Sequence, residues 1–306
     1  MVTSNEISKR IRILEEHPAA YIKSRIKEFE EAAATPDWAT THIKKKIEKE
    51  LRSNEHSSGY GALLTARSRA PFMIYWAQSK IIEMESENAS LIHRALKNVW
   101  WAFKCRPETY GDYESIIQLL VPWFAIAGDK AKSDFIGSYI CGISNIIGHE
   151  QYLQTSIGKF IAALWAIHNQ DKHPILKEKL LESTGNDHYD GLIKNIDSKD
   201  NELVENMIYG ALDYHIRSSS TENGELRTSF PFYLLPVEIY YYIDIRLHKG
   251  LSTTAPKHPI FGSNLSSAAL ISDTFSSGSD DLLLRAIGHA IKLDWITQSD
   301  LAKYGV

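Results

Sequence analysis

Residues 70–105 read APFMIYWAQSKIIEMESENASLIHRALKNVWWAFKC. On a helical wheel this stretch is apolar nearly all round, and it ends in Val99-Trp100-Trp101-Ala102-Phe103 shortly before Pro107. A helix that is hydrophobic on every side belongs in the interior of a protein. We therefore expect a central helix over residues 70–105, and the pattern also allows an interruption near Ser86-Glu87-Asn88.

Helical spacing continues on both sides of this stretch, with apolar residues every three or four positions. The predicted helices cover 36–51, 109–127, 131–147, 150–168, 173–184, 200–218, 232–249, 264–275, 279–293 and 297–303. Strand alternation is scarce, and Tyr240-Tyr241-Tyr242 fits a helix that begins at Pro236 better than a strand. The sequence predicts an all-α protein of antiparallel helical hairpins. They are packed as one globular array or, as the alternative, stacked as a short solenoid.

We expect three parts along the chain. Residues 1–56 form an N-terminal helical arm, in which amphipathic helices are broken or kinked at Pro18 and a loop over residues 53–59 leads into the main body. Residues 57–262 form the main all-α domain. Residues 263–306 form a C-terminal helical extension packed on the main domain.

The composition is that of a globular protein, with 306 residues, 43% apolar, 24% charged, and 34 basic against 38 acidic side chains. These values exclude disordered, collagen-like and membrane classes. The two cysteines, Cys105 and Cys141, form no Cys-x-x-Cys pair, which indicates a reducing compartment. The first residues lack an apolar signal core, and the most apolar stretch, Ile116 to Ala127, is too short to span a bilayer. We expect a cytoplasmic protein that does not contact a membrane.

A search for catalytic motifs finds none that is complete. A metal site on helices needs His and carboxylate three or four residues apart, and the nearest cases are Asp244 with His248 and His168 with Asp171. Ser138 does not stand in a Gly-x-Ser-x-Gly elbow, and the glycine spacings of phosphate-binding loops are missing. We expect no catalytic residue, no cofactor and no metal ion, and we do not expect an enzyme.

Two enzymatic alternatives stay open. Arg12 and His17 have the Arg-x-x-x-x-His spacing of helical ribonucleases, although Ile13 stands where that motif has a polar residue. His168 and His173 are the histidines that a helical metal hydrolase would use.

The clearest charge anomaly lies in residues 182–205, where seven carboxylates face two lysines. An acidic surface steers a basic partner through its long-range field, although a solvated loop region is the alternative. The residues predicted to contact a partner protein are Asp187, Asp190, Asp197, Asp200 and Glu202. The basic residues Lys44, Lys45, Lys46 and Lys49 stand among the acidic residues Glu48 and Glu50. We therefore do not expect nucleic-acid binding.

Three stretches carry a resemblance to a known family: VPWFAIAGDKA at 121–131, FIAALWAI at 160–167 and LPVEIYYYIDIRLHKGL at 235–251. In the last stretch a helix follows a proline and ends at a glycine. Over about residues 60–262 the order of these segments resembles the all-helical immunity proteins of bacterial polymorphic-toxin systems, the family numbered forty-nine.

The resemblance implies a stoichiometric inhibitor in the cytoplasm, which binds a cognate toxin and blocks its active site or its fold. Such a toxin is expected to be basic where it contacts the acidic residues. A helical-repeat adaptor or scaffold that binds peptides is the second possibility, and a helical hydrolase or ribonuclease is the third.

Overall fold

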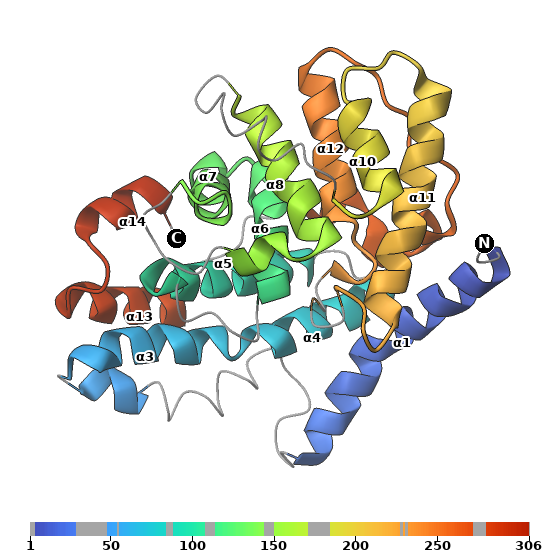
Figure 1. The fold of residues 1–306 in the computed structure, drawn as a ribbon. Helices are drawn as coiled ribbons and strands as arrows, with labels where there is room; N and C mark the ends of the chain where they lie inside the picture. The colour runs from blue at the N-terminus through green and yellow to red at the C-terminus, as the bar shows by residue number, and fades with distance from the viewer. Residues whose placement is uncertain are drawn as a thin grey trace. The chain divides into compact units, whose positions relative to one another are not determined.

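The computed structural model describes residues 4–28, 48–53, 55–83, 88–107, 114–143, 150–170, 184–226, 229, 232–271 and 280–305. Within these ranges every regular element is a helix and there is no strand (Figure 1). The predicted all-α class is therefore confirmed.

The helices group into two compact units, and each unit is made of two stretches of chain. The large unit contains residues 1–15 and 111–272, and the small unit contains residues 16–110 and 273–306. The three parts expected from the sequence follow the order of the chain, whereas each unit joins stretches that lie far apart in it. Helix α1 (Ser4–Glu28) contributes to both units.

The small unit is built around the apolar stretch 70–105. Besides part of α1, the helices of this unit are α3 (His56–Arg67), α4 (Ala70–Ile82), α5 (Ala89–Cys105), α13 (Asp281–Lys292) and α14 (Gln298–Tyr304). The apolar stretch forms α4 and α5. Helix α5 packs on α3 and α4, and α13 packs on α3. Trp100 and Trp101 of α5 are fully buried, and their rings meet edge to face with 4.9 Å between centroids. The stretch is thus two helices with the interruption between them, and α5 lies in the core.

The large unit contains the remaining α-helices: α6 (Glu114–Ile126), α7 (Lys130–Ile140), α8 (Ser156–His168), α10 (Asp187–Lys194), α11 (Asn201–Ser220) and α12 (Val237–His248). Helix α6 packs on α7, α8 and α12, and α10 packs on α8 and α11. Short 3-10 helices complete the unit: η3 (Glu150–Leu153), η5 (Pro259–Gly262), η6 (Asn264–Ser266) and η7 (Ala268–Ile271).

Helix α12 follows a proline and is closed by a glycine, as its sequence predicts. It begins directly after Pro236. It ends at Gly250, whose φ of 73° is left-handed and suits a residue without a Cβ. There Leu251 N donates to Arg246 O and Gly250 N donates to Leu247 O, both at 2.9 Å. These two bonds form a Schellman motif, which satisfies the last carbonyl groups of the helix.

Two features of the N-terminal arm differ from the expectation. The helix expected to be broken or kinked at Pro18 is not broken there, because α1 continues through this residue. A proline removes only one backbone hydrogen bond, and packing of neighbouring side chains, such as Tyr21 on Tyr75 at 4.2 Å between centroids, offsets that loss. The loop expected over residues 53–59 already contains the start of α3 at His56, because Ala62 and Leu63 are fully buried and hold the helix in the core.

Two further differences concern short elements. The helix expected over residues 264–275 is a pair of 3-10 turns up to Ile271, because Ser263 Oγ and Ser267 Oγ accept from nearby backbone N–H groups and compete with α-helical bonds. Helix α10, only eight residues long, was not predicted. Parts of several expected helices lie outside the described residues, at positions 36–47, 84–87, 109–113, 144–147, 173–183, 272–275 and 279.

Candidate functional site

The five predicted partner-binding residues lie at two places in the large unit. Asp187 and Asp190 belong to the first turn of α10. Asp197 lies in the turn after α10, Asp200 is the N-cap of α11, and Glu202 belongs to the first turn of α11. A helix of eight residues is about 12 Å long at 1.5 Å per residue, so the two groups stand at opposite ends of α10.

At the start of α10 the acidic residues serve the helix itself. Asn186 is the N-cap, and its side chain accepts from His188 N at 3.0 Å and from Tyr189 N at 3.2 Å. Asp190 Oδ1 accepts from Thr184 N at 2.7 Å, and Asp187 is exposed. Carboxylates in a first turn are favourable because the helix N-terminus carries a partial positive charge.

At the other end, the last turns of α10 and α12 meet the first turn of α11 (Figure 1). Lys249 Nζ lies 2.6 Å from Asp197 Oδ1, and Asn201 Nδ2 donates to Ser252 Oγ at 3.3 Å. Asp200 Oδ1 caps α11 by accepting from Leu203 N at 3.0 Å. We name this surface the acidic edge, and it consists of Asp197, Lys199, Asp200, Glu202, Leu203, Glu205, Leu247 and Lys249.

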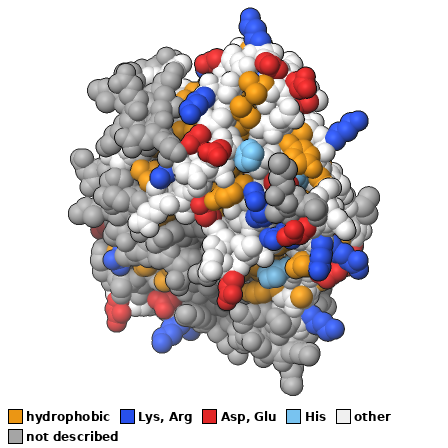
Figure 2. Space-filling model, turned by 45° about the vertical axis from the view of Figure 1, so that its right-hand side comes forward, with side chains coloured by type: hydrophobic (Ala, Val, Ile, Leu, Met, Phe, Trp, Pro, Cys, Tyr) orange, Lys and Arg blue, Asp and Glu red, His pale blue; other side chains and the backbone are white. Residues whose placement is uncertain are grey.

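The acidic edge combines charge with exposed apolar surface. Its four carboxylates face two lysines. Leu203 is 38% exposed and Leu247 is 57% exposed, which is unusual for leucine in a protein whose other large apolar residues are mostly buried. Figure 2 shows acidic, basic and hydrophobic side chains close together at the top of the drawn face. Leucine and carboxylate side chains on one surface offer a partner both apolar contact and charge.

Arg246 of α12 supports the acidic edge from beneath and is itself fully buried. Its Nη1 donates to the carbonyl oxygens of Asn195 at 3.1 Å and Ile196 at 2.9 Å. Its remaining donors reach the Ser198 and Ser252 carbonyl oxygens and Thr253 Oγ1, at 2.9, 3.4 and 2.7 Å. All five N–H groups of the guanidinium are used. A positive charge among carbonyl groups at the ends of α10 and α12 is favourable, because helix C-termini carry partial negative charge.

A second polar cluster lies in the core of the large unit. His215 Nδ1 lies 2.8 Å from Glu238 Oε1, and His215 Nε2 lies 2.9 Å from Phe232 O. The Tyr189 hydroxyl donates to the same Glu238 oxygen at 3.3 Å. A carbonyl oxygen only accepts, so His215 Nε2 carries a proton and donates to Phe232 O. Burial is the main reason that the pKa of Tyr189 lies well above its ordinary value, and the nearby carboxylates of Glu238 and Glu225 raise this pKa further.

This cluster joins α10, α11 and α12, and it is closed to solvent. Both side chains of the His215–Glu238 pair have no exposed surface. A substrate therefore has no access to the pair in this structure, and we assign it a structural role near the starts of α10 and α12, away from the acidic edge. Neither residue was predicted from the sequence, because the two lie 23 positions apart on different helices.

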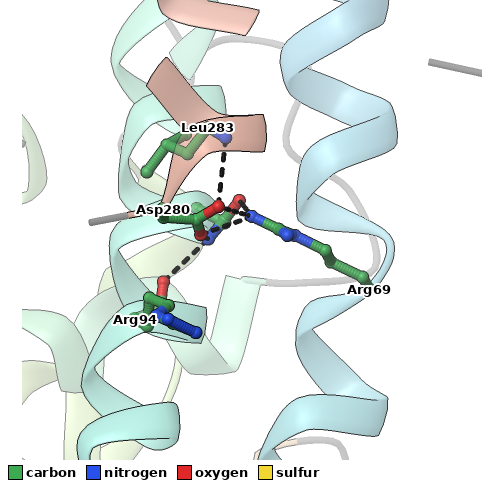
Figure 3. A network of polar contacts seen from close by, with 5 residues as sticks. Arg69, Arg94, Asp280 and Leu283 are labelled. Carbon is green, nitrogen blue, oxygen red and sulfur yellow. Dashed lines mark hydrogen bonds and ion pairs between the residues drawn. The ribbon is translucent and has the colours of Figure 1, made fainter. Parts of the chain in front are cut away.

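The small unit has a buried ion pair of its own, drawn in Figure 3. Arg69, before α4, pairs with Asp280, the N-cap of α13, and also donates to Asn98 Oδ1 of α5 at 3.0 Å. Asp280 Oδ1 also accepts from Leu283 N at 3.1 Å. Burial opposes ionisation of Asp280, but Arg69, Asn98 and Leu283 N outweigh it and lower the pKa of this carboxyl. The pair joins α4, α5 and α13, so its role is structural.

Of the two enzymatic alternatives, the structure separates the first pair of residues and describes only one residue of the second pair. Arg12 and His17 lie five positions apart on α1, about 140° around the helix axis, and so point to different faces. His168 ends α8 beside Tyr241 and His248, at 6.1 Å between ring centroids in each case, and His173 lies outside the described residues. Among the residues that the structure describes, no group of three or more His, Cys, Asp or Glu side chains is placed to hold a metal ion.

No family model, no curated protein and no solved structure matches the chain. In the described part of the chain, no helix combines the length and apolar character needed to cross a membrane.

Proposed function

We propose that this chain is an immunity-type protein, a stoichiometric inhibitor of a cognate bacterial toxin domain whose contact surface is basic. The observation that carries the proposal is the acidic edge, where carboxylates and exposed leucines of α11 and α12 surround a turn held by the buried Arg246. Carboxylates raise the rate of association with a basic partner, and leucines that lose water on binding slow dissociation. The toxin class comes from the family resemblance.

The partner is identified by affinity capture of the tagged full-length chain from its native host, with a high-salt wash before mass spectrometry. Salt weakens exposed charge contacts but leaves a desolvated interface in place. We expect one dominant partner with a toxin-like C-terminal domain, which is lethal when expressed alone and harmless when co-expressed with this chain. A set of several weak partners without toxin activity favours the adaptor function, and turnover by the purified chain favours the enzyme.

The binding surface is then tested by the triple variant Asp197→Asn, Asp200→Asn, Glu202→Gln. Asparagine caps a helix as well as aspartate does, so this variant removes charge and keeps the start of α11. We expect association with the toxin to slow by about tenfold or more, with a weaker salt dependence. Leu247→Ser is expected to speed dissociation instead.

The matched control for these variants is Glu55→Gln, which removes an exposed carboxylate from the small unit. It should leave both rates unchanged. If the triple variant and Leu247→Ser both bind the toxin with unchanged rates, the acidic edge is not the binding surface.

A further inference from the structure

His258 lies between α11 and the 3-10 helix η5, all within the large unit. Its side chain is fully buried, and its Nε2 lies 3.1 Å from Asp213 Oδ1 of α11. Its Nδ1 accepts a hydrogen bond from Ile260 N at 3.1 Å, which caps η5. The Tyr209 ring packs edge-on against the imidazole, with 4.7 Å between centroids. One side chain therefore caps η5 and ties it to α11.

The partners of His258 assign its proton. A backbone N–H can only donate, so Nδ1 carries no proton when it accepts from Ile260. The Asp213 carboxylate accepts, so Nε2 carries the proton. The imidazole is therefore neutral. A second proton on Nδ1 would place two donors against each other, and the Ile260 bond would be lost.

We propose that His258 is a pH-sensitive latch, in which protonation of Nδ1 breaks the cap of η5 and lets residues 259–265 open. Within this segment Ile260 and Leu265 are buried, so release brings apolar side chains to solvent. The Tyr240 hydroxyl donates to Ser266 O just beyond the segment. Because this second contact involves no group that titrates near neutral pH, it limits the opening to the chain before residue 266. The latch is independent of the proposed toxin binding.

The charges around His258 set the direction of the switch. Tyr209, Asp213 and His215 of α11 face the imidazole, and His215 is itself paired with Glu238 of α12. Burial is the largest influence and lowers the pKa of His258; Asp213 opposes this and His215 adds to it, so the pKa lies below the ordinary value.

A released histidine titrates near its ordinary value of about 6.5, so it binds a proton more readily than the buried one. The latch is therefore fully closed above about pH 6.5 and weakens as the pH falls below this value.

Hydrogen exchange followed by NMR tests the latch at the amides of Ile260, Phe261 and Ser263. Their protection factors, corrected for intrinsic exchange, are compared between pH 7.5 and pH 5.5. An opening linked to one proton increases by at most about tenfold per pH unit below the pKa of the released histidine. We expect a loss of protection that approaches this limit at these three amides and a smaller loss at Leu270 in η7.

Three variants separate the latch from general acid destabilisation. His258→Asn keeps a capping side chain that does not titrate, and it should abolish the local pH dependence. Asp213→Asn keeps an acceptor for Nε2 but removes the charge that favours the imidazolium in the closed state, so the loss of protection should begin at the same pH and continue to lower pH than in the wild type. His248→Asn, at a largely exposed histidine, should behave as the wild type.

Two results would overturn the latch. One is equal loss of protection at Ile260, Phe261 and Ser263 in the wild type and in His258→Asn. The other is a proton on Nδ1 at neutral pH, which long-range proton–nitrogen NMR correlations of the wild-type imidazole detect without any substitution.

Discussion

Arg246 Nη1 lies 2.9 Å from the carbonyl oxygen of Ile196, a residue 50 positions earlier in the chain. This contact joins the last turn of α12 to the turn that follows α10, and the neighbouring Asn195 and Ser198 carbonyl groups are held by the same guanidinium. The turn that carries Asp197, at the start of the acidic edge, is therefore fixed by hydrogen bonds to one buried side chain. A fixed backbone favours recognition, because little conformational entropy is lost when a partner binds.

Replacing Arg246 by methionine should destabilise the large unit strongly. The methionine fills a similar volume but removes the guanidinium donors of one buried carbonyl group, that of Ile196, and of three carbonyl groups and one hydroxyl that are partly buried. Because each buried polar group left unsatisfied costs about 1–3 kcal/mol and some of these groups will gain water, we expect a loss of about 3 kcal/mol or more. Urea denaturation measures the free energy of unfolding. Arg246→Lys should lose less, and a loss below about 1 kcal/mol in Arg246→Met would contradict the assigned role.

The N-cap of α11 should respond to Asp200→Ala and tolerate Asp200→Asn. The Asp200 side chain satisfies Leu203 N, and an N-cap lost to alanine typically costs about 1 kcal/mol. Asparagine accepts the same bond, so its free energy of unfolding should stay close to that of the wild type. Glu202→Ala, in the same turn but not at the N-cap position, serves as the control and should change stability by less than about 0.5 kcal/mol. Equal effects of Asp200→Ala and Asp200→Asn would show that charge, and not the cap, stabilises this turn.

The sequence predicts best the elements whose apolar spacing is long and strong. Trp100 and Trp101 belong to a stretch that is apolar on every side, and both are fully buried. The sequence does not predict helix α10, because eight residues form only about two helical turns and show too little apolar spacing. Its stability comes from packing on α8 and α11. At Pro18 a local rule predicted a break, and side-chain packing along α1 overrides it.

The site is harder to predict than the fold, since its geometry depends on contacts between distant residues. The local charge excess at 182–205 identified the acidic residues, but not that α10 separates Asp187 from Asp197. Arg246 and Glu238 look like ordinary charged residues of an amphipathic helix, and both are fully buried. Their partners lie in segments that no spacing rule connects to α12. The one available signal was the position of each on the apolar face of its predicted helix.

Two helical glycines should respond to alanine with opposite signs. A Cβ at Gly137 in α7 would lie 2.3 Å from Trp165 Nε1, and the Trp165 ring is held in the core by α8. Overpacking of this kind typically costs about 1–3 kcal/mol. A Cβ at Gly288 in α13 meets no atom within 4 Å, so Gly288→Ala should gain about 0.5–1 kcal/mol from its helix propensity. Thermal denaturation of both variants measures the difference, and a stabilised Gly137→Ala would show that α7 and α8 are less closely packed.

The two cysteines should be unreactive in the folded protein. Burial raises the pKa of the Cys141 thiol to about 12, and it raises the pKa of Cys105 to about 12 while Lys104 opposes the shift and Asp300 adds to it. At pH 8 only about one thiol in ten thousand is then the reactive thiolate, so alkylation should be on the order of a thousandfold slower than in the unfolded chain. Iodoacetamide labelling with and without guanidinium, followed by mass spectrometry, measures both rates. The cysteines lie in different units, so rapid native labelling of one alone would show that its unit opens independently of the other.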